Sequence, residues 1–266
     1  MLRCPQSGGL MKRDDRRQAI MDHLATHRAA TLDDLALRFA VSKMTIHRDL
    51  DDLEHAGFLR KLRGGASVEP GTQFESDFRI RARQDAGAKA RMAQAAAALV
   101  EPGMTVLIND GSMAAVLAET LLDRRPLTVI TNNAAVLDRL RAEMRLRLIA
   151  LGGEYDAKYN GFFGMVTETA LSRLRADLAF ISSPAVNGLS VFHMDADVVR
   201  TKRAMMAAAG QSCLLVNHKR FGTAALHLLA DLTAFQTIIT DDDPGAEARA
   251  ALDSAGLSLT IATEAA

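Results

Sequence analysis

Residues 41–57, VSKMTIHRDLDDLEHAG, have the pattern of an amphipathic helix with two defined ends. Ser42 is a typical N-cap residue, and Gly57 is of the kind that ends helices in a left-handed conformation. At about 100° per residue, three apolar side chains fall within one narrow sector of the helix: Ile46, Leu50 and Leu53. The pattern therefore predicts a helix that buries this one face.

The first turns of this helix carry residues suited to contact DNA. A major groove about 12 Å wide admits one helix end-on, and the positive end of the helix dipole lies at that end. We therefore predict DNA contacts from six residues: Ser42, Lys43, Met44, Thr45, His47 and Arg48. The acidic side chains come later, where the helix would leave the phosphates: Asp49, Asp51, Asp52 and Glu54. Taken alone, this pattern is equally that of a core helix.

Two shorter helical patterns precede this segment. The first covers residues 16–26, where Ile20 and Leu24 lie four apart on one face, and a loop is expected at residues 27–30. Thr31 then has the position of an N-cap, with Asp34 three residues on as in a capping box. The apolar stripe of this second helix consists of Leu32, Leu35 and Phe39.

The segment after Gly57, FLRKLRGGASV, alternates in polarity around a Gly-Gly turn and predicts a small β-hairpin. Its cations would lie beside the helix and suit a clamp on DNA phosphates. The hairpin residues that we predict to contact DNA are Arg60, Lys61, Arg63, Gly64 and Gly65. Three helices followed by a basic hairpin are the order of a winged helix-turn-helix, here expected over residues 14–69.

Composition gives weaker guidance. The 266 residues have a formal charge of zero, but residues 1–68 carry 12 Lys and Arg against 9 Asp and Glu, so they are modestly cationic. The two cysteines, Cys4 and Cys213, suit neither a disulfide framework nor a zinc site. No apolar run approaches the roughly 20 residues that span a bilayer, and the first residues lack a signal-peptide core. We expect a cytoplasmic protein with no membrane partner, metal or other cofactor.

The rest of the chain alternates between strand and helix patterns. Residues 70–91 are helix-rich with several arginines, and we interpret them as a solvated linker helix region. Beyond them, strand patterns occur at residues 104–110, 127–132, 145–151, 178–182, 213–217 and 237–240, with helices at 112–122 and 134–143. This alternation implies βαβ crossovers and a mostly parallel sheet. The second domain is expected over residues 92–258.

Polar residues gather directly after these strands, at the edge where open α/β sheets bind small ligands. A Gly-Ser pair that opens a helix offers N–H groups and a hydroxyl to an anion, and nearby cations neutralise it. The residues predicted to bind an effector, a phosphorylated small molecule by this chemistry, are Asp110, Gly111, Ser112, Thr131, Asn132, Asn133, Gly152, Gly153, Lys202, Asn217, Lys219 and Arg220. The same residue types also serve any strand-to-helix turn.

The first domain resembles the DNA-binding domain of the DeoR-type bacterial transcriptional regulators. Their Val-Ser-x-x-Thr-Ile-Arg-Arg-Asp-Leu helix and Gly-Gly-Ala wing correspond to residues 41–50 and 64–66. Two positions depart from the family pattern: His47 stands where Arg is usual, and Arg63 where His is usual. Because a histidine is shorter and can be neutral, the usual operator contact at His47 is in question.

The resemblance continues to Asp243 and implies an effector domain related in fold to ribose-5-phosphate isomerase, which in this family commonly senses phosphorylated sugars. The family's Asp-x-Gly-Thr-Thr, Thr-Asn, Gly-Gly, Lys-Arg-x-Met and Asp-His-Ser-Lys-Phe-Gly motifs correspond to residues 109–113, 131–132, 152–153, 202–205 and 217–222. Met113, Asn217 and Arg220 depart from these motifs. The segment ISSPAVNG, residues 181–188, lacks a carboxylate where an isomerase would need its general base, which disfavours catalysis.

We therefore predict a DNA-binding transcriptional regulator, in this family most often a repressor, whose operator affinity is controlled by a phosphorylated sugar or related metabolite. Paired half-sites on double-stranded DNA imply a homodimer or homotetramer. The alternative is a sugar-phosphate isomerase or deaminase with an appended DNA-binding domain. A third hypothesis is a regulator whose second domain has lost its ligand and only dimerises.

Overall fold

The computed structural model describes residues 11–68 and 77–263. The chain divides between Pro70 and Gly71 into two compact units, here called the N-terminal unit and the C-terminal unit. Each is described by itself.

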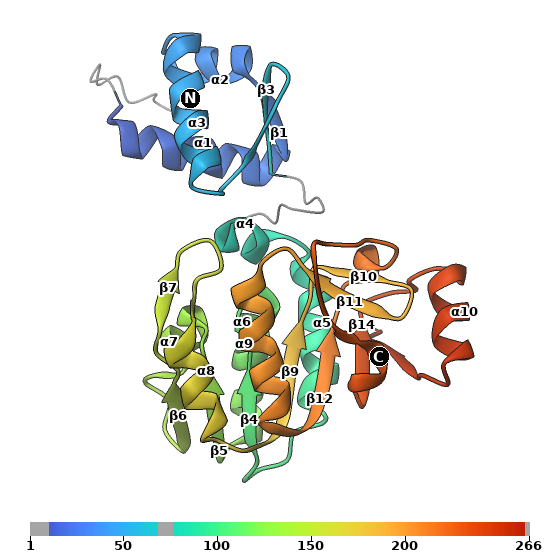
Figure 1. Ribbon diagram of the computed structural model, residues 1–266. Coiled ribbons are helices and arrows are strands. Elements are labelled where there is room, and N and C mark those ends of the chain that lie inside the picture. Colours follow the sequence, from blue (N-terminus) through green and yellow to red (C-terminus); the bar gives the residue numbers. More distant parts are fainter. Residues whose placement is uncertain (1–10, 69–76, 264–266) are drawn as a thin grey trace, which may run out of the picture. The chain divides into compact units, whose positions relative to one another are not determined.

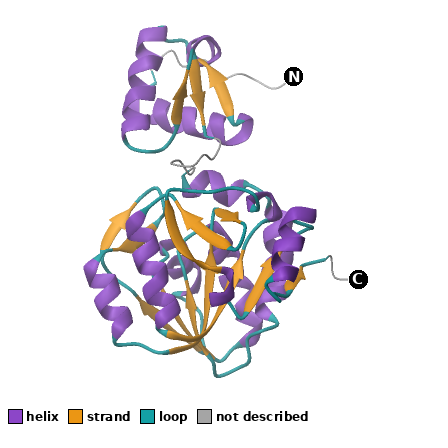
Figure 2. Ribbon diagram, turned by 45° about the vertical axis from the view of Figure 1, so that its right-hand side comes forward, coloured by secondary structure: helices purple, strands orange, loops and turns teal. Residues whose placement is uncertain are grey.

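The N-terminal unit packs its helices against a small antiparallel sheet of strand order β1-β3-β2 (Figures 1 and 2). Its elements are α1 (Arg13–His27), β1 (Ala29–Thr31), α2 (Leu32–Phe39), α3 (Lys43–His55), β2 (Arg60–Leu62) and β3 (Gly65–Ser67). The predicted helices and the hairpin are confirmed. The loop expected at residues 27–30 is wrong in part, because Ala29 and Ala30 belong to β1, which pairs with Ser67 and Ala66 of β3.

Local sequence sets the ends of α2 and α3. Thr31 Oγ1 accepts a hydrogen bond from Asp34 N–H at 3.1 Å, and Ser42 Oγ accepts one from Thr45 N–H at 3.1 Å. Gly57, at φ 73°, ends α3, since its N–H donates to Glu54 O and the next N–H donates to Leu53 O. The unit's core consists of the predicted apolar faces, with fully buried Ile20, Leu24, Leu35, Ile46 and Leu50.

The C-terminal unit is built on a seven-stranded, wholly parallel sheet of order β15-β14-β12-β9-β4-β5-β6 (Figure 1). Its strands are β4 (Thr105–Ile108), β5 (Leu127–Thr131), β6 (Leu146–Ala150), β9 (Ala176–Ser182), β12 (Ala209–Leu215), β14 (Thr237–Thr240) and β15 (Leu259–Ile261). The prediction of an α/β fold with a parallel sheet is confirmed, although β15 was not foreseen.

Helices cover both faces of this sheet, so its central strands are buried on both sides (Figure 2). On β9, Leu178 and Phe180 point to one apolar cluster, whereas Ala179 and Ile181 point to another. The helices are α4 (Phe78–Arg83), α5 (Ala86–Ala97), α6 (Ser112–Thr120), α7 (Ala134–Leu140), α8 (Met165–Ser172), α9 (Ala196–Ala207) and α10 (Ala246–Ser254). Short 3₁₀ turns are η1 (Leu121–Arg124), η2 (His218–Arg220) and η3 (Leu232–Ala234).

Two small antiparallel sheets, both absent from the sequence prediction, lie beside the main sheet. One is a hairpin of β7 (Glu154–Asp156) and β8 (Gly161–Phe163). The other joins β10 (Ala185–Asn187), β11 (Ser190–His193) and β13 (His227–Asp231).

The segment interpreted as a solvated linker is instead part of the C-terminal unit where it is described. Phe78 and Ile80 of α4 are buried, and α5 places Met92, Ala93 and Ala96 in the core. Met92, Ala93 and Ala96 lie in the range expected for the second domain, and within the predicted linker it is Phe78, Ile80 and Arg81 that are buried. In the part of the chain that the structure describes, no helix combines the length and the apolar character needed to cross a bilayer.

Candidate DNA-binding surface and ligand pocket

The N-terminal end of α3 presents the side chains that the sequence assigns to DNA. Ser42, Met44, His47 and Arg48 are exposed, and Met44 is 63% exposed despite being apolar. Thr45 is half-buried, with its Oγ1 2.9 Å from Ser42 Oγ. Lys43 forms an ion pair with Asp33 of α2, so this cation is partly neutralised before any DNA arrives.

Three of the four acids of α3 pair with cations of the same unit. Asp49 is buried: Arg16 Nε lies 2.5 Å from its Oδ2 and Arg17 Nε lies 3.3 Å from its Oδ1. Asp52 pairs with Arg17, and Asp51 pairs with Lys61. Three of the four negative charges of α3 are therefore compensated within the unit, and Glu54 accepts the backbone N–H of Lys61.

The cations of the wing, which is the hairpin of β2 and β3, differ in their surroundings. Lys61 is tied to α3, because its ammonium pairs with Asp51 and its N–H donates to Glu54 Oε1 at 2.7 Å. Its prediction as a free phosphate clamp is thus weakened by a carboxylate that the sequence did not place beside it. Arg60 and Arg63 are exposed, and within the described residues neither is in an ion pair.

The Gly-Gly turn of the wing has a steric cause. Gly64 has φ 84°, a conformation that favours glycine. A Cβ on Gly65 would lie 2.2 Å from the carbonyl oxygen of Ala30, so β3 approaches β1 this closely only because residue 65 has no side chain. The two glycines therefore shape the wing through the backbone.

A pocket in the C-terminal unit lies at the carboxyl ends of β4, β9 and β12, the edge predicted for ligand binding. It brings together five of the predicted residues, namely Asp110, Ser112, Lys202, Asn217 and Arg220. Gly111, at φ 106°, forms the turn between the first two. The sequence prediction missed seven further polar residues of its lining: Arg81, Gln84, Asp85, Lys89, Ser182, Ser183 and His193.

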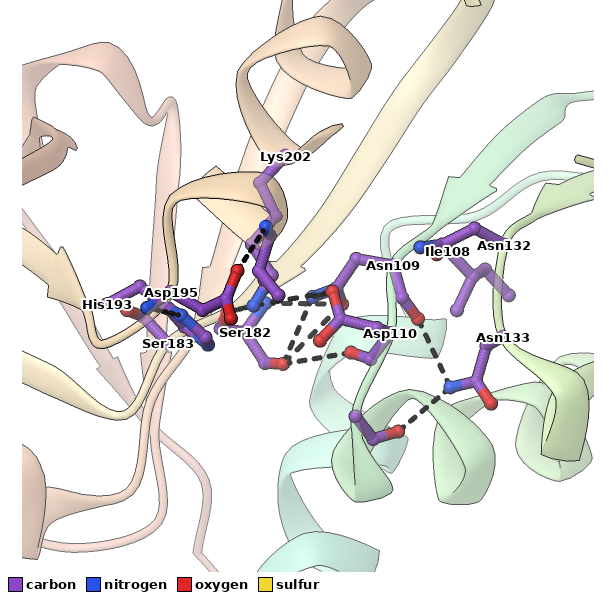
Figure 3. A network of polar contacts seen from close by, with 12 residues as sticks. Ile108, Asn109, Asp110, Asn132, Asn133, Ser182, Ser183, His193, Asp195 and Lys202 are labelled. Atoms are coloured by element: carbon purple, nitrogen blue, oxygen red, sulfur yellow. Dashed lines mark hydrogen bonds and ion pairs between the residues drawn. The ribbon is translucent and has the colours of Figure 1, made fainter. Parts of the chain in front are cut away.

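A buried ion pair lies at the centre of this pocket (Figure 3). Lys202 Nζ lies 3.5 Å from Asp110 Oδ1, and each side chain is only 2% exposed. Lys202 also donates to Ser182 O at 2.8 Å, which joins α9 to the end of β9. A buried charge without a partner is heavily penalised, and here the two side chains lie against each other.

The Thr-Asn-Asn segment supports the pocket from behind and does not line it. Asn133 Nδ2 donates to the carbonyls of Asn109 and Gly111 at 3.3 and 3.0 Å, while its Oδ1 caps α7 (Figure 3). Thr131 Oγ1 donates to Ile108 O at 2.7 Å. Asn132 is also fully buried and donates to Phe162 O at 2.9 Å. Thr131 and Asn133 therefore hold the end of β4 and the loop that carries Asp110, whereas Asn132 ties this segment to β8.

Gly152 and Gly153 likewise lie outside the pocket lining. Thr167 Oγ1 donates to Gly152 O at 2.6 Å, and a Cβ on Gly153 would lie 2.4 Å from Phe163 O. Gly153 therefore lets the chain pass closely over β8 and α8, whereas Gly152 contributes the carbonyl that Thr167 binds. Polar and small residues at strand ends can serve a ligand or a scaffold, and for these five predicted positions the structure shows scaffold contacts.

Cations gather around the remaining pocket. Lys89 donates to Gln84 O at 2.6 Å and to Arg81 O, and burial lowers its pKa to about 8. Lys219 lies beside the pocket and not in its lining: its Nζ is 3.0 Å from Asp85 Oδ1. Burial acts to raise the pKa of Asp85, but the hydrogen bond from Lys219 and the positive charges of Lys219, Lys89 and Arg220 together keep that pKa below its usual value.

His193, which lines the pocket, has a defined ring orientation. The N–H of Asp195 donates to His193 Nδ1 at 3.1 Å, so Nδ1 is the accepting nitrogen and a hydrogen resides on Nε2 (Figure 3). The four pocket cations Arg81, Lys89, Lys202 and Arg220 outnumber the carboxylates of Asp85 and Asp110. This arrangement suits an anion. Among the described residues, no His, Cys, Asp and Glu side chains cluster in a way that could hold a metal ion.

A three-helix unit with a basic wing, joined to an α/β unit with a separate pocket, defines a helix-turn-helix transcriptional regulator with a sensor domain. Two family models match this chain: the DeoR-like helix-turn-helix domain over residues 16–70 and the DeoR C terminal sensor domain over residues 84–242. The chain belongs to the DeoR family of transcriptional regulators, as the resemblance in its sequence predicted.

Individual relatives agree with this assignment. An uncharacterised HTH-type transcriptional regulator, YgbI of Escherichia coli K12, is 31% identical over 93% of this chain and 97% of its own. The glycerol-3-phosphate regulon repressor of the same strain is 27% identical over 88% of this chain and 93% of its own. Among solved structures, ribose 5-phosphate isomerase A of Methanocaldococcus jannaschii covers 50% of this chain and 53% of its own, with 18% identity and a TM-score of 0.37.

Proposed function

We propose that this protein is a repressor that binds a double-stranded DNA operator through α3 and the wing and is released from it, or retained on it, by an anionic metabolite in the C-terminal unit. The metabolite class we favour is a phosphorylated sugar or a related derivative. Ligand binding would shift the balance between DNA-competent and DNA-incompetent arrangements by its differential affinity for them.

The pocket carries this proposal. It joins an excess of cations to the hydroxyls of Ser112, Ser182 and Ser183, a set that suits a phosphate or carboxylate attached to a polyol. Ser112 is the first residue of α6, whose N–H groups and dipole favour negative charge. The relative named as the glycerol-3-phosphate regulon repressor supports both repression and a phosphorylated ligand.

On the DNA side we assign base contacts to His47 and Arg48 and backbone contacts to Lys43, Thr45, Arg60 and Arg63. Exposure at the start of α3 and on the wing supports this assignment. One such module offers few base contacts, so we propose a homodimer or homotetramer that binds paired half-sites in the cytoplasm. Sedimentation of the full-length protein with and without operator DNA tests the oligomeric state.

We further propose that the pocket binds its ligand without turning it over. The pocket does contain carboxylates, Asp85 and Asp110, although residues 181–188 contain none. Asp110 lies against Lys202 and Asp85 against Lys219, and the pKa of Asp85 is held below its usual value, which makes this carboxylate a poorer general base. The isomerase or deaminase alternative predicts turnover of aldose or ketose phosphates that is lost in Asp110→Asn.

The proposed DNA binding is tested with the full-length protein and DNA fragments selected from genomic sequence. We expect Arg48→Ala to abolish sequence-specific binding. Arg141→Ala removes an arginine that is 75% exposed in the C-terminal unit and serves as the matched control, with unchanged affinity. Equal operator affinity of wild type and Arg48→Ala would refute the groove assignment.

The ligand arm is tested by thermal shift against a panel of phosphorylated sugars, sugar acids and inorganic phosphate. A ligand at about 100 times its Kd should stabilise the C-terminal unit by about 2.7 kcal/mol. Arg220→Ala should weaken binding, whereas Arg141→Ala should not. A pocket that has lost its ligand and serves only dimerisation would give no shift with any member of the panel.

A further inference from the structure

His47 lies on the exposed side of α3 with its ring fixed by two neighbours. Its Nδ1 lies 3.2 Å from Asp51 Oδ2, one helical turn further on, and 3.5 Å from Lys61 Nζ of the wing. Lys61 Nζ in turn pairs with Asp51 Oδ1. Half of the His47 side chain remains exposed, at 47%.

The position of the ring hydrogen follows from these contacts. Lys61, and then His47, donate hydrogen bonds to Asp51 that keep the pKa of this carboxyl below its usual value, so Asp51 is an ionised acceptor. An acceptor facing Nδ1 requires that Nδ1 carry the hydrogen. The competing arrangement, in which a bare Nδ1 accepts from Lys61, has the longer distance of 3.5 Å and would oppose a lone pair to the carboxylate at 3.2 Å.

A neutral imidazole has one donor and one acceptor. With the hydrogen held on Nδ1 by Asp51, the other ring nitrogen, Nε2, becomes the acceptor. In the major groove, adenine N6 and cytosine N4 are the base donors, whereas guanine O6 and thymine O4 are acceptors. An accepting Nε2 therefore distinguishes the amino bases from the keto bases on the strand that it faces.

We propose that His47 is a specificity-determining residue that accepts a hydrogen bond through Nε2 from the exocyclic amine of adenine or cytosine, with Asp51 as the positioning residue that fixes its tautomer. This inference rests on the proposed binding of operator DNA by α3. It predicts that one position in each half-site is adenine or cytosine on the strand that His47 contacts.

The experiment is selection of bound sequences from a randomised DNA library at about pH 8, above the range in which imidazoles ordinarily ionise. Full-length wild type should enrich an adenine or cytosine at one position of each half-site, by about fivefold or more over guanine and thymine. His47→Arg, which only donates, should change that position to guanine. Asp51→Ala should reduce the enrichment toward onefold while the other operator positions keep theirs.

His55→Gln is the matched control, because His55 is an exposed histidine in the last turn of the same helix. It should leave the selected sequence unchanged. Long-range ¹⁵N–¹H spectra of the free protein give a second readout that needs no DNA: in wild type His47 should have a protonated Nδ1 and an unprotonated Nε2, and Asp51→Ala should shift both signals toward a tautomer mixture.

The outcomes separate this inference from the function on which it rests. A wild type that enriches no sequence would overturn both. A wild type that enriches an operator, but has guanine or thymine at the position that His47→Arg alters, would overturn the role of His47 and leave DNA binding intact. A protonated Nε2 in the free protein would overturn the tautomer assignment.

Discussion

The buried ion pair between Arg16 and Asp49 joins α1 to α3 and permits a quantitative test of what holds the DNA-facing helix in place. Arg16 donates through Nε at 2.5 Å and Nη2 at 3.2 Å, and the two side chains are 8% and 2% exposed. Asp49→Asn removes the negative charge, turns one accepting oxygen into a donating amide, and leaves the guanidinium buried without its counter-charge. Removal of one partner from a buried pair costs about 3–5 kcal/mol.

This cost is large for a small unit. A domain of about 60 residues has a total stability of only about 3–9 kcal/mol. Hydrogen exchange of the full-length protein measures the two units separately, and protection of α1 and α3 amides should fall about 100-fold or more in Asp49→Asn. Amides of the C-terminal unit should be unaffected. Operator affinity should fall although Asp49 contacts no DNA.

Asp52→Asn provides the matched control. It makes the same change in charge on the same helix, but Asp52 is 54% exposed and pairs with Arg17 at the surface. An exposed ion pair contributes about 0–1 kcal/mol, so protection should change little. If Asp49→Asn lowered the free energy of unfolding of the N-terminal unit by less than about 1 kcal/mol, as in the control, the Arg16–Asp49 pair would not be what anchors α3.

Four further predictions address the wing and the pocket. Arg60→Ala should weaken binding to all sequences and lower the slope of log affinity against log salt by about one, and an unchanged slope would exclude a phosphate contact. Gly65→Ala should destabilise the N-terminal unit by about 1–3 kcal/mol in urea unfolding, since its Cβ must displace β3 from Ala30; an unaltered midpoint would contradict this close approach. Ligand affinity should fall as the pH rises through about 8, where Lys89 loses its charge, and calorimetric titration of Lys89→Met should lack this dependence. Because the unfolded state keeps that proton up to the ordinary lysine pKa of 10.5, the ligand-free C-terminal unit should conversely gain stability above about pH 8, and a loss there would contradict the burial of Lys89.

The N-terminal unit could be predicted almost completely because its signals are local. Thr31 and Ser42 cap the helices that follow them, and Gly57 ends α3 in the conformation that its lack of a side chain permits. What sequence reasoning missed depends on partners far along the chain. Asp49 has the appearance of a surface acid until α1 brings Arg16 against it, 33 residues away.

The pocket was predicted only in outline for the same reason. The alternation of strands and helices indicated the edge of the sheet at which the pocket lies, and Asp110, Lys202 and Arg220 are in its lining. Arg81 and Lys89 were missed, because nothing in an arginine-rich helical segment indicates which turn of it folds over a strand end. Conversely, Asn133 was assigned to a ligand because a side chain that caps a helix and one that binds a phosphate use the same amide group.

The compensation of charge within the N-terminal unit explains how a chain of zero net charge can present a cationic surface. Three acids of α3 face cations of the same unit: Asp49 and Asp52 face α1, and Asp51 faces the wing. Arg48, Arg60 and Arg63, which form no ion pair within the described residues, lie exposed at the start of α3 and on the wing. A count of charges treats all of these groups as equal. DNA phosphates interact most strongly with exposed cations that are not paired with a carboxylate. The number of such cations that contact phosphates sets the dependence of binding on salt.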